Sequence, residues 1–559
     1  MKKKLIIIIP SIIILIALVL VSYLMLSPKK YTLDSNNTNK ISINIKNNKE
    51  EKIKLNITDD NKNIVLNNFN NKKNSNYIIF LLKDTEDKII KKGIIHNNDD
   101  TIIYDVKKGE YTLSFIYSGK NKFKLEGNIK LEEAEKKEYS TLKSGMDIKS
   151  KITELTNRDS KDETIKNIKL AKKMNSEYEN DNYIVSTENS SKPIYMWVEE
   201  DTIYFYSENN IEFNENSYSM FSYLSALTDV SDLKYFNAEK VEDMSYMFKS
   251  DENLSDIKFI SYLNTPKLED MSDMFSGCYS LIDITPLISL NTSNVDNISF
   301  ILDDTSVNDI TIFKYFDVSK VKNISGFISG TNVSDLTPIS KWDISNVESM
   351  LSAFSTTKIK NVDALKEWNT SKVKTMDYLF YCCVNLENID GIKDWDTSSL
   401  KGFSHGLEYT NLTNLDGLKN WNTKQLEELE AAFSYIRDLK DINGIANWNT
   451  SKVKSFKELL NYTSITNTDA LKKWNTSNVV NMESLLSHTK VKNLNGLKSW
   501  DTSKVENFKQ AFDHISAKDI SGIEKWNIDN GNNFERMFDK AKKTPNWSGT
   551  FDEEGTYVK

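Results

Sequence analysis

The most regular feature of the chain is an alternation of apolar and polar positions that repeats every 26 or 27 residues. Each repeat starts with an aromatic residue or leucine that is followed at once by Asn or Asp. These anchor residues are Phe236, Leu263, Leu290, Phe316, Trp342, Trp368, Trp395, Trp421, Trp448, Trp474, Trp500 and Trp526. A fixed period of this length is typical of a solenoid, in which each unit packs only on its neighbours. The sequence therefore predicts an array of about twelve units over residues 236–538.

Within each repeat, apolar residues follow the anchor at spacings that suit one face of a helix, as in Val373, Met376 and Phe380. A serine three residues after most anchors stands where a helix N-cap belongs. A second apolar pair before the anchor, such as Leu415 and Leu418, favours a short strand or an extended arch. We therefore expect an α/β solenoid, a leucine-rich-repeat-like, right-handed array with one short strand and one short helix in each unit.

The segments around the array carry different patterns. Short alternating runs separated by turn residues fill residues 31–135 and predict a small, all-β, sandwich-like domain. Residues 136–190 are rich in charged residues and Asn, and we interpret them as a polar spacer with a short helix around Ile165. Residues 191–235 and 539–559 are expected to cap the two ends of the array, because terminal coils would otherwise expose core to water.

The first thirty residues carry a targeting signal. Three lysines, Lys2 to Lys4, precede an apolar run from Leu5 to Leu26, and a run of about 20 residues matches the hydrocarbon thickness of a bilayer. A secretory signal peptide usually has a shorter apolar region and a small-residue cleavage site. We therefore favour an uncleaved, single-pass transmembrane anchor at residues 1–30, with cleavage as the open alternative. The leading lysines predict a cytoplasmic N-terminus and an extracellular location for the bulk of the chain.

Composition and the lack of known motifs argue against several classes of function. The 80 acidic and 72 basic residues give a net charge of -8, which does not indicate nucleic-acid binding, because such proteins carry a basic surface. Cys278, Cys382 and Cys383 are interpreted as small core fillers, and the four histidines show no paired spacing suited to zinc. The sequence contains no nucleophile elbow, H-E-x-x-H motif, P-loop or Rossmann glycine pattern. We expect no catalytic residues, no metal site, no cofactor and no enzymatic activity.

Two features of the repeat allow a functional and a structural interpretation. The Trp column could be an exposed stripe for sugar stacking, but early units have Phe or Leu at the same position, so packing is the better account. The Asn or Asp after each anchor could bind calcium, although such side chains commonly cap turns. The most deviant unit contains Gly402, His405 and Gly406, for which we prefer a local packing variation over a unique site.

The repeat resembles a known family. The pattern W-[ND]-T-S-x-V-x-x-M-x-x-x-F, followed by L-x-x-[LI]-x-G-[LI], is similar to the BspA-like leucine-rich-repeat surface proteins of bacteria over roughly residues 193–559. The segments from Met244 to Phe248, from Met271 to Cys278 and from Trp368 to Val373 carry the match best. The resemblance implies surface display and interaction with molecules of a host or a neighbouring cell. The units at 290 and 316 depart from it by replacing Met and Phe with Ile or Leu.

These observations favour a cell-surface binding or adhesion protein that presents an extended repeat surface to a macromolecular partner. The expected partner is a protein or a glycan on a host or neighbouring cell. The alternative is a structural envelope protein that contacts neighbouring membrane or cell-wall proteins. The sequence assigns neither the ligand-binding residues nor the binding face.

Overall fold

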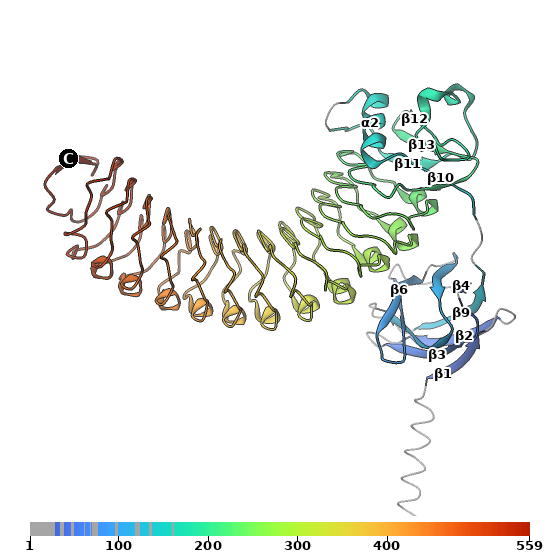
Figure 1. Ribbon diagram of the computed structural model, residues 1–559, viewed down its shortest axis with the longest axis horizontal. Coiled ribbons are helices and arrows are strands. Elements are labelled where there is room, and N and C mark those ends of the chain that lie inside the picture. The colour runs from blue at the N-terminus through green and yellow to red at the C-terminus, as the bar shows by residue number, and fades with distance from the viewer. Residues whose placement is uncertain are drawn as a thin grey trace, which may run out of the picture. The chain divides into compact units, whose positions relative to one another are not determined.

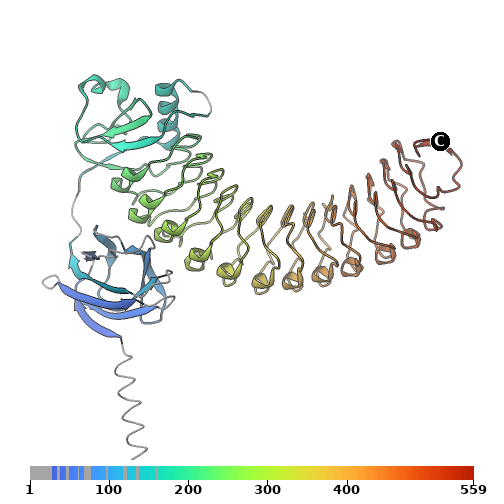
Figure 2. The same cartoon turned by 180° about the vertical axis from the view of Figure 1, so that it is seen from behind.

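The structure, a computed structural model, divides into two compact units, Met1–Lys137 and Glu138–Lys559. Figures 1 and 2 show the chain from opposite sides. The described residues are 28–33, 38–45, 50–60, 62–67, 69, 77–95, 99–117, 123–133, 137–158 and 161–558.

The first unit contains two β-sheets within its described residues. One sheet has the strand order β1-β3-β8-β5-β6, and the other has the order β2-β9-β4-β7. Strands β1 and β3 are parallel, whereas the other neighbouring strands are antiparallel. The strands span Lys29–Leu33 (β1), Asn39–Ile45 (β2), Glu51–Ile57 (β3), Lys62–Asn67 (β4), Ile78–Lys83 (β5), Ile89–Ile95 (β6), Thr101–Val106 (β7), Gly109–Tyr117 (β8) and Phe123–Glu132 (β9).

The alternation of residue types along the strands explains how the two sheets pack. In β3, Ile53 and Ile57 are buried whereas Lys54 is exposed, because successive side chains of a strand point to opposite faces. The buried residues of both sheets join one hydrophobic cluster, to which Phe115 contributes from the first sheet and Ile129 from the second. The core of this unit therefore lies between the two sheets.

The membrane anchor expected at residues 1–30 is corrected by the structure. Among the described residues, no helix has both the length and the apolar character needed to cross a bilayer. Lys29 and Lys30, which we placed at the end of the anchor, begin strand β1. Residues 1–27, which hold the remainder of that segment, lie outside the described residues. The structure thus gives no basis for a single-pass membrane protein with an extracellular bulk.

The second unit begins with short strands and helix α2 (Gly145–Thr156), the only α-helix among the described residues. Ser144 caps this helix by accepting a hydrogen bond from the backbone N–H of Asp147 (3.3 Å). Asn157 ends it in the left-handed conformation. The helix lies earlier in the chain than the one that we expected around Ile165. The other elements here are Tyr139–Thr141 (β10), Asn167–Leu170 (β11), Ser176–Tyr178 (η1), Asp181–Tyr183 (η2), Tyr195–Glu199 (β12), Thr202–Tyr206 (β13) and Asn210–Glu212 (β14).

The rest of the second unit is an array of coils. Single parallel β-bridges join residues one period apart, for example Asp243 with Asp270 and Asn297 with Asn323. Figure 1 shows the coils following one another along an arc, with a 3₁₀ turn drawn as a coiled ribbon on the outer side. These turns span Ser231–Tyr235 (η3), Lys258–Tyr262 (η4), Thr285–Ser289 (η5), Thr311–Tyr315 (η6), Thr337–Ile339 (η7), Asp363–Leu365 (η8), Asp390–Ile392 (η9), Asp416–Leu418 (η10), Asn443–Ile445 (η11), Asp469–Leu471 (η12) and Asn495–Leu497 (η13).

The segment after each anchor is a pair of β-turns rather than the expected short helix. In the coil of Trp368, the N–H of Leu379 donates to the carbonyl oxygen of Met376 (3.2 Å), and the N–H of Cys383 donates to that of Phe380 (3.1 Å). These bonds span three residues, whereas an α-helix would span four. We call this part of each coil the double turn.

Two residues of each double turn have a positive φ, which ends any helical path. Tyr378 has a φ of 56° and Cys382 has a φ of 54°, and a positive φ at the third residue is a feature of type II turns. Their N–H groups point to the next coil, where they donate to the carbonyl oxygens of Ser404 (2.8 Å) and Glu408 (2.9 Å). The backbone donors that a helix would use internally therefore hold neighbouring coils together.

The apolar pattern could not distinguish these two structures. Met376, Leu379, Phe380 and Cys383 are all fully buried, and two successive four-residue turns repeat the spacings of three and four that a helix shows. The pair before the anchor is also not a strand, since Leu418 ends the 3₁₀ turn η10. The expected α/β solenoid with a strand and a helix in each unit is therefore wrong, and so is its description as a leucine-rich-repeat-like array.

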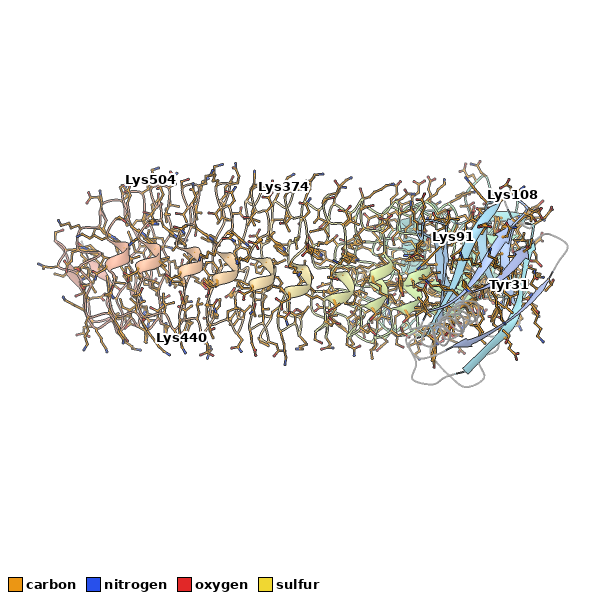
Figure 3. All side chains as sticks on the ribbon, turned by 90° about the horizontal axis from the view of Figure 1, so that it is seen from below. Tyr31, Lys91, Lys108, Lys374, Lys440 and Lys504 are labelled. Carbon is orange, nitrogen blue, oxygen red and sulfur yellow. The ribbon has the colours of Figure 1, made fainter. Side chains whose placement is uncertain are left out.

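The double turns lie along the inner edge of the arc. Viewed from the outer side, Lys374 and Lys504 project from one flank of the array and Lys440 projects from the other (Figure 3). Each double turn separates two such flanking segments along the chain, opposite the 3₁₀ turn. Each coil thus has an outer turn, which is a 3₁₀ turn in every coil before that of Trp526, two polar flanks and an inner double turn.

The far end of the array is closed by strands β15 (Thr550–Phe551) and β16 (Tyr557–Val558). The N–H of Phe538 in the last coil donates to the carbonyl oxygen of Gly555 (3.0 Å). The Tyr557 ring packs against the ring of Phe534 at 5.2 Å. These contacts cover the last apolar layer, which has no further coil to pack against.

Candidate functional site

Five ring side chains form a continuous stack along the inner edge of the array. Tyr409, Tyr435, Tyr462, His488 and His514 occupy the same position in five successive coils, and all are half-buried. Neighbouring ring centroids lie 4.5, 4.6, 4.1 and 4.1 Å apart in this order, with interplanar angles of 18°, 11°, 13° and 17°. We call these five residues the aromatic ladder.

The double turn positions each ring of the ladder. All five residues are the second positive-φ residue of their coil, with φ between 53° and 59°. Their N–H groups donate to the next coil, as Tyr435 does to the carbonyl oxygen of Asn461 (2.8 Å) and His488 to that of Asp513 (2.9 Å). Coils joined in this way repeat at about the 4.7–4.9 Å spacing of hydrogen-bonded strands. This spacing is close to the contact distance of stacked rings.

Two further tyrosines and a histidine extend the ring surface toward the earlier coils. Tyr378 stacks on His405 at 4.4 Å with an interplanar angle of 11°. Tyr381 contacts the His405 ring edge-on at 6.4 Å and the Tyr409 ring edge-on at 5.9 Å. The deviant unit around His405 therefore joins this surface to the aromatic ladder.

The Trp column, by contrast, is part of the core. Trp368 and Trp395 stack at 6.4 Å with an interplanar angle of 5°, and the exposed fraction of the eight anchor tryptophans lies between 3% and 7%. Each indole also donates to a carbonyl oxygen of the preceding coil, as Trp395 does to Leu365 (3.0 Å). A buried column cannot stack on sugars, so the continuous stack of rings that a ligand can reach is the one along the inner edge.

The Asn or Asp after the anchor caps a turn in the ten coils from Leu290 to Trp526. Asn369 accepts from the N–H of Ser371 (3.2 Å), and the Ser371 hydroxyl donates to the same side-chain oxygen (2.8 Å). The serine therefore closes an Asx turn and does not cap a helix. A carboxamide oxygen engaged in this way is not available as a calcium ligand.

The phenols of Tyr381, Tyr409 and Tyr435 remain protonated at neutral pH. Burial raises the pKa of Tyr409 and Tyr435 above the usual value for tyrosine, and it raises the pKa of Tyr381 to about 12. Each hydroxyl can therefore donate a hydrogen bond to a partner as well as accept one.

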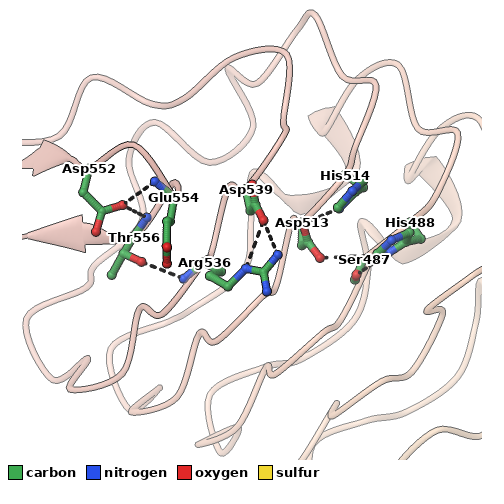
Figure 4. A network of polar contacts seen from close by, with 9 residues as sticks. All are labelled: Ser487, His488, Asp513, His514, Arg536, Asp539, Asp552, Glu554 and Thr556. Atoms are coloured by element: carbon green, nitrogen blue, oxygen red, sulfur yellow. Dashed lines mark hydrogen bonds and ion pairs between the residues drawn. The ribbon is translucent and has the colours of Figure 1, made fainter.

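At the end of the ladder, two histidines flank a buried carboxylate (Figure 4). The Nδ1 atom of His514 lies 2.5 Å from Asp513 Oδ1, and the Nδ1 atom of His488 lies 3.8 Å from Asp513 Oδ2. The side chain of Asp513 is 2% exposed, whereas those of the two histidines are 28% and 30% exposed. Burial, followed by the neighbouring His514 ring, lowers the pKa of His488 below its usual value.

Short spacings along the sequence do not reveal this cluster of histidines. His488 and His514 are 26 residues apart and fall at the same position of two consecutive repeats. Stacked coils bring such positions into contact. Comparing equivalent positions of neighbouring repeats would have identified the pair; His96 lies outside the described residues.

The cysteines fill space in the array. Cys278 and Cys383 are fully buried and Cys382 is half-buried, and all three are free. Burial raises the pKa of the Cys278 thiol well above its usual range and that of Cys383 to about 11. Thiols in this state are poor nucleophiles at neutral pH.

Comparison with known proteins identifies the repeat. The sequence model of one family, described as "Mycoplasma protein of unknown function, DUF285", matches three tandem segments, residues 215–337, 327–443 and 427–549. No curated protein and no solved structure matches the chain. The prediction of a tandem repeat family is thus confirmed, but the more specific assignment to BspA-like leucine-rich-repeat proteins has no support. Through matches that together run from residue 215 to residue 549, more than half of its length, the chain belongs to this repeat family.

Proposed function

We propose that the protein is a binding scaffold and that it docks a partner protein along the inner edge of the array. The observation that carries the proposal is the aromatic ladder, in which five half-buried rings stack at 4.1 to 4.6 Å in register with the coils. Aromatic residues are enriched in the cores of protein interfaces, where they supply much of the binding energy.

The ladder is held in place before any partner arrives. Each ring is clamped between two neighbours, except at the ends of the stack, and its backbone is fixed by the hydrogen bonds between coils. Rings that are already ordered lose little conformational freedom on binding, which favours affinity. A long array offers such a surface over several coils, as extended repeat proteins commonly do.

The geometry favours a protein over a glycan as the partner. Sugars stack on the faces of aromatic rings, but the faces of Tyr435 and Tyr462 are covered by their neighbours in the ladder. What remains accessible is the ring edges and the polar tips. Edges of this kind suit apolar side chains and backbone groups of a protein.

The flanks of the array are less suited to this role. They carry ladders of paired charges, such as Lys322 with Asp296 (2.8 Å) and Lys374 with Glu348 (2.6 Å). A polar groove on this flank is lined by Lys320, Asn346 and other residues of the same kind. Exposed ion pairs contribute about 0–1 kcal/mol each, so such a surface is adequately solvated without a partner.

The test is to probe the full-length protein against an array of purified proteins and an array of glycans. We expect binding to a protein, and we expect the double substitution Tyr435→Ser and Tyr462→Ser to weaken it by at least about tenfold, as loss of interface hot spots does. The matched control is Tyr235→Ser with Tyr279→Ser, because these tyrosines are 58% and 54% exposed and lie outside the ladder.

Two outcomes would refute the proposal. One is binding to glycans alone, which would show that ring faces or polar flanks are used instead. The other is a protein partner whose affinity falls equally in the ladder variant and in the control variant. Circular dichroism of both variants would establish that the array remains folded.

A further inference from the structure

The cluster of His488, Asp513 and His514 has a chemistry that protein docking does not require. One potential ligand atom from each residue lies within 4.8 Å of those of the other two. Two imidazole nitrogens and one carboxylate oxygen form a common ligand set for zinc in proteins. Among the described residues, no other group of three or more His, Cys, Asp and Glu side chains brings its possible ligand atoms this close together.

The carboxylate at the base of the cluster is placed to attract a cation. Asp513 is buried, and its carboxylate oxygens lie 2.5 Å from the Nδ1 atom of His514 and 3.8 Å from the Nδ1 atom of His488. The nearby guanidinium of Arg536 is bound instead to Asp539, with an Nε–Oδ2 distance of 2.9 Å. A buried negative charge is costly unless a cation or hydrogen-bond donors compensate it.

The two histidines supply accessible nitrogens. Both side chains are more than a quarter exposed, so an ion can reach them from solvent. A neutral imidazole retains the lone pair that a metal requires, and metal binding displaces the proton of a charged one. The Nδ1 atom of His488 is hydrogen-bonded to the Ser487 hydroxyl (2.8 Å).

We propose that His488, Asp513 and His514 form a site for one Zn²⁺ ion, bound through one ring nitrogen of each histidine and the carboxylate of Asp513. The fourth position of the tetrahedron is left to water or to a partner's side chain. This proposal does not depend on the docking of a protein along the ladder.

Binding requires a small rearrangement of the rings. The His488 and His514 planes are 17° apart and their centroids are separated by 4.1 Å. An ion at the usual Zn–N distance of about 2.0–2.1 Å has to lie near the plane of each ring. One ring therefore has to turn, and the solvent-exposed part of both side chains leaves room for this.

The test uses the full-length protein, labelled with ¹³C in the histidine rings, and titrates it with zinc chloride alone. The chain has only four histidines, so their signals can be assigned by single substitutions. We expect the signals of His488 and His514 to shift together and to saturate at one ion per chain, while those of His405 and His96 do not change. Equal shifts of all four signals, or none, would overturn the proposal.

Substitutions provide an independent measurement by calorimetry. We expect His514→Gln, His488→Gln and Asp513→Asn each to weaken zinc binding by at least about tenfold, the scale of losses at metal sites. His405→Gln is the matched control, because His405 also pairs with a buried carboxylate, Glu408 (2.5 Å), but has no second histidine beside it. Unchanged affinity in His514→Gln would refute the site, even if Asp513→Asn fails to fold.

Discussion

The indole Nε1 of Trp368 donates a hydrogen bond of 3.1 Å to the carbonyl oxygen of Ile339 in the preceding coil. The same oxygen accepts the backbone N–H of Trp342, also at 3.1 Å. One carbonyl thus closes the turn of its own coil and anchors the next one. The relationship repeats at every tryptophan anchor, for example between Trp474 and the carbonyl oxygen of Ile445 (3.0 Å).

We expect Trp368→Phe to destabilise the array by about 1 kcal/mol, the net value of a typical hydrogen bond. The loss stays small because Ile339 keeps its bond to Trp342, and because Phe316 shows that a phenyl ring fits an anchor position. Trp368→Ala should cost about 3–5 kcal/mol, since it leaves a cavity. Chemical denaturation measures both losses; equal values would show that the N–H group, not ring packing, dominates.

Glycine is required at some positive-φ positions and not at others. Gly326 has a φ of 56°, and a Cβ atom there would lie 2.1 Å from Cδ1 of Phe300. We expect Gly326→Ala to cost at least about 2 kcal/mol, because left-handed strain alone amounts to 1–2 kcal/mol and the Phe300 ring has to move. Thermal unfolding of the purified variant would measure this.

The control for that prediction is Ala431→Gly. Ala431 occupies the equivalent position of a later coil with a φ of 49°, and its methyl group is buried. Relief of strain is opposed by the larger entropy of glycine in the unfolded chain, so the net change should stay within about 1 kcal/mol. A large loss in Ala431→Gly would mean that its methyl group, and not φ, governs the position.

The sequence predicted the period and the anchors of the array but not the backbone between them. Val373, Met376 and Phe380 were correctly placed in the core, because burial depends on spacing alone. The choice between a helix and a double turn depends on where N–H groups donate, and that depends on the neighbouring coil. The N–H of Tyr378 bonds to Ser404, 26 residues later, a contact that no local pattern contains.

The candidate site was missed for a related reason. The rings of Tyr435 and Tyr462 have ordinary neighbours in the sequence, and their function as a surface arises from stacking between coils. The tyrosines and histidines share only a planar aromatic ring and the same position in successive repeats, so composition does not single them out. The Trp column attracted attention through its regularity, although regularity here reflects core packing.

Buried threonine hydroxyls form a second link between coils. The Oγ1 atom of Thr397 accepts the N–H of Asn422 (2.7 Å) and donates to the carbonyl oxygen of the same residue (3.2 Å). Thr397→Val keeps the shape but leaves the Asn422 N–H without this partner, which should cost about 1–3 kcal/mol. Thr397→Ser retains the hydroxyl and should cost less. Denaturation curves of the two variants make the comparison, and equal losses would assign the effect to the methyl group.

Because Asp303 is partly buried, we expect the free energy of unfolding to decrease as the pH rises. Burial, more than the nearby Asp304 and Asp273 carboxylates, raises its pKa from the usual 3.8 to about 6. Between these two values the folded protein binds more protons than the unfolded chain, so the free energy of unfolding falls as pH increases. The cost of burying this charge is absent below the lower value and fully present above the upper one.

Asp303→Asn should therefore stabilise the protein at pH 7 by about 1–2 kcal/mol, after allowance for solvent screening of a partly exposed group, and should have no effect below pH ~4. Because arrays can unfold in parts, amide hydrogen exchange near residue 303 is the suitable measurement at both pH values. Asp501→Asn is the control, and it should destabilise the protein at pH 7. Hydrogen bonds from Ser503 lower the pKa of Asp501, so its charged form is the one that the fold stabilises. A gain in Asp303→Asn that persists at low pH would show that packing, not charge, is responsible.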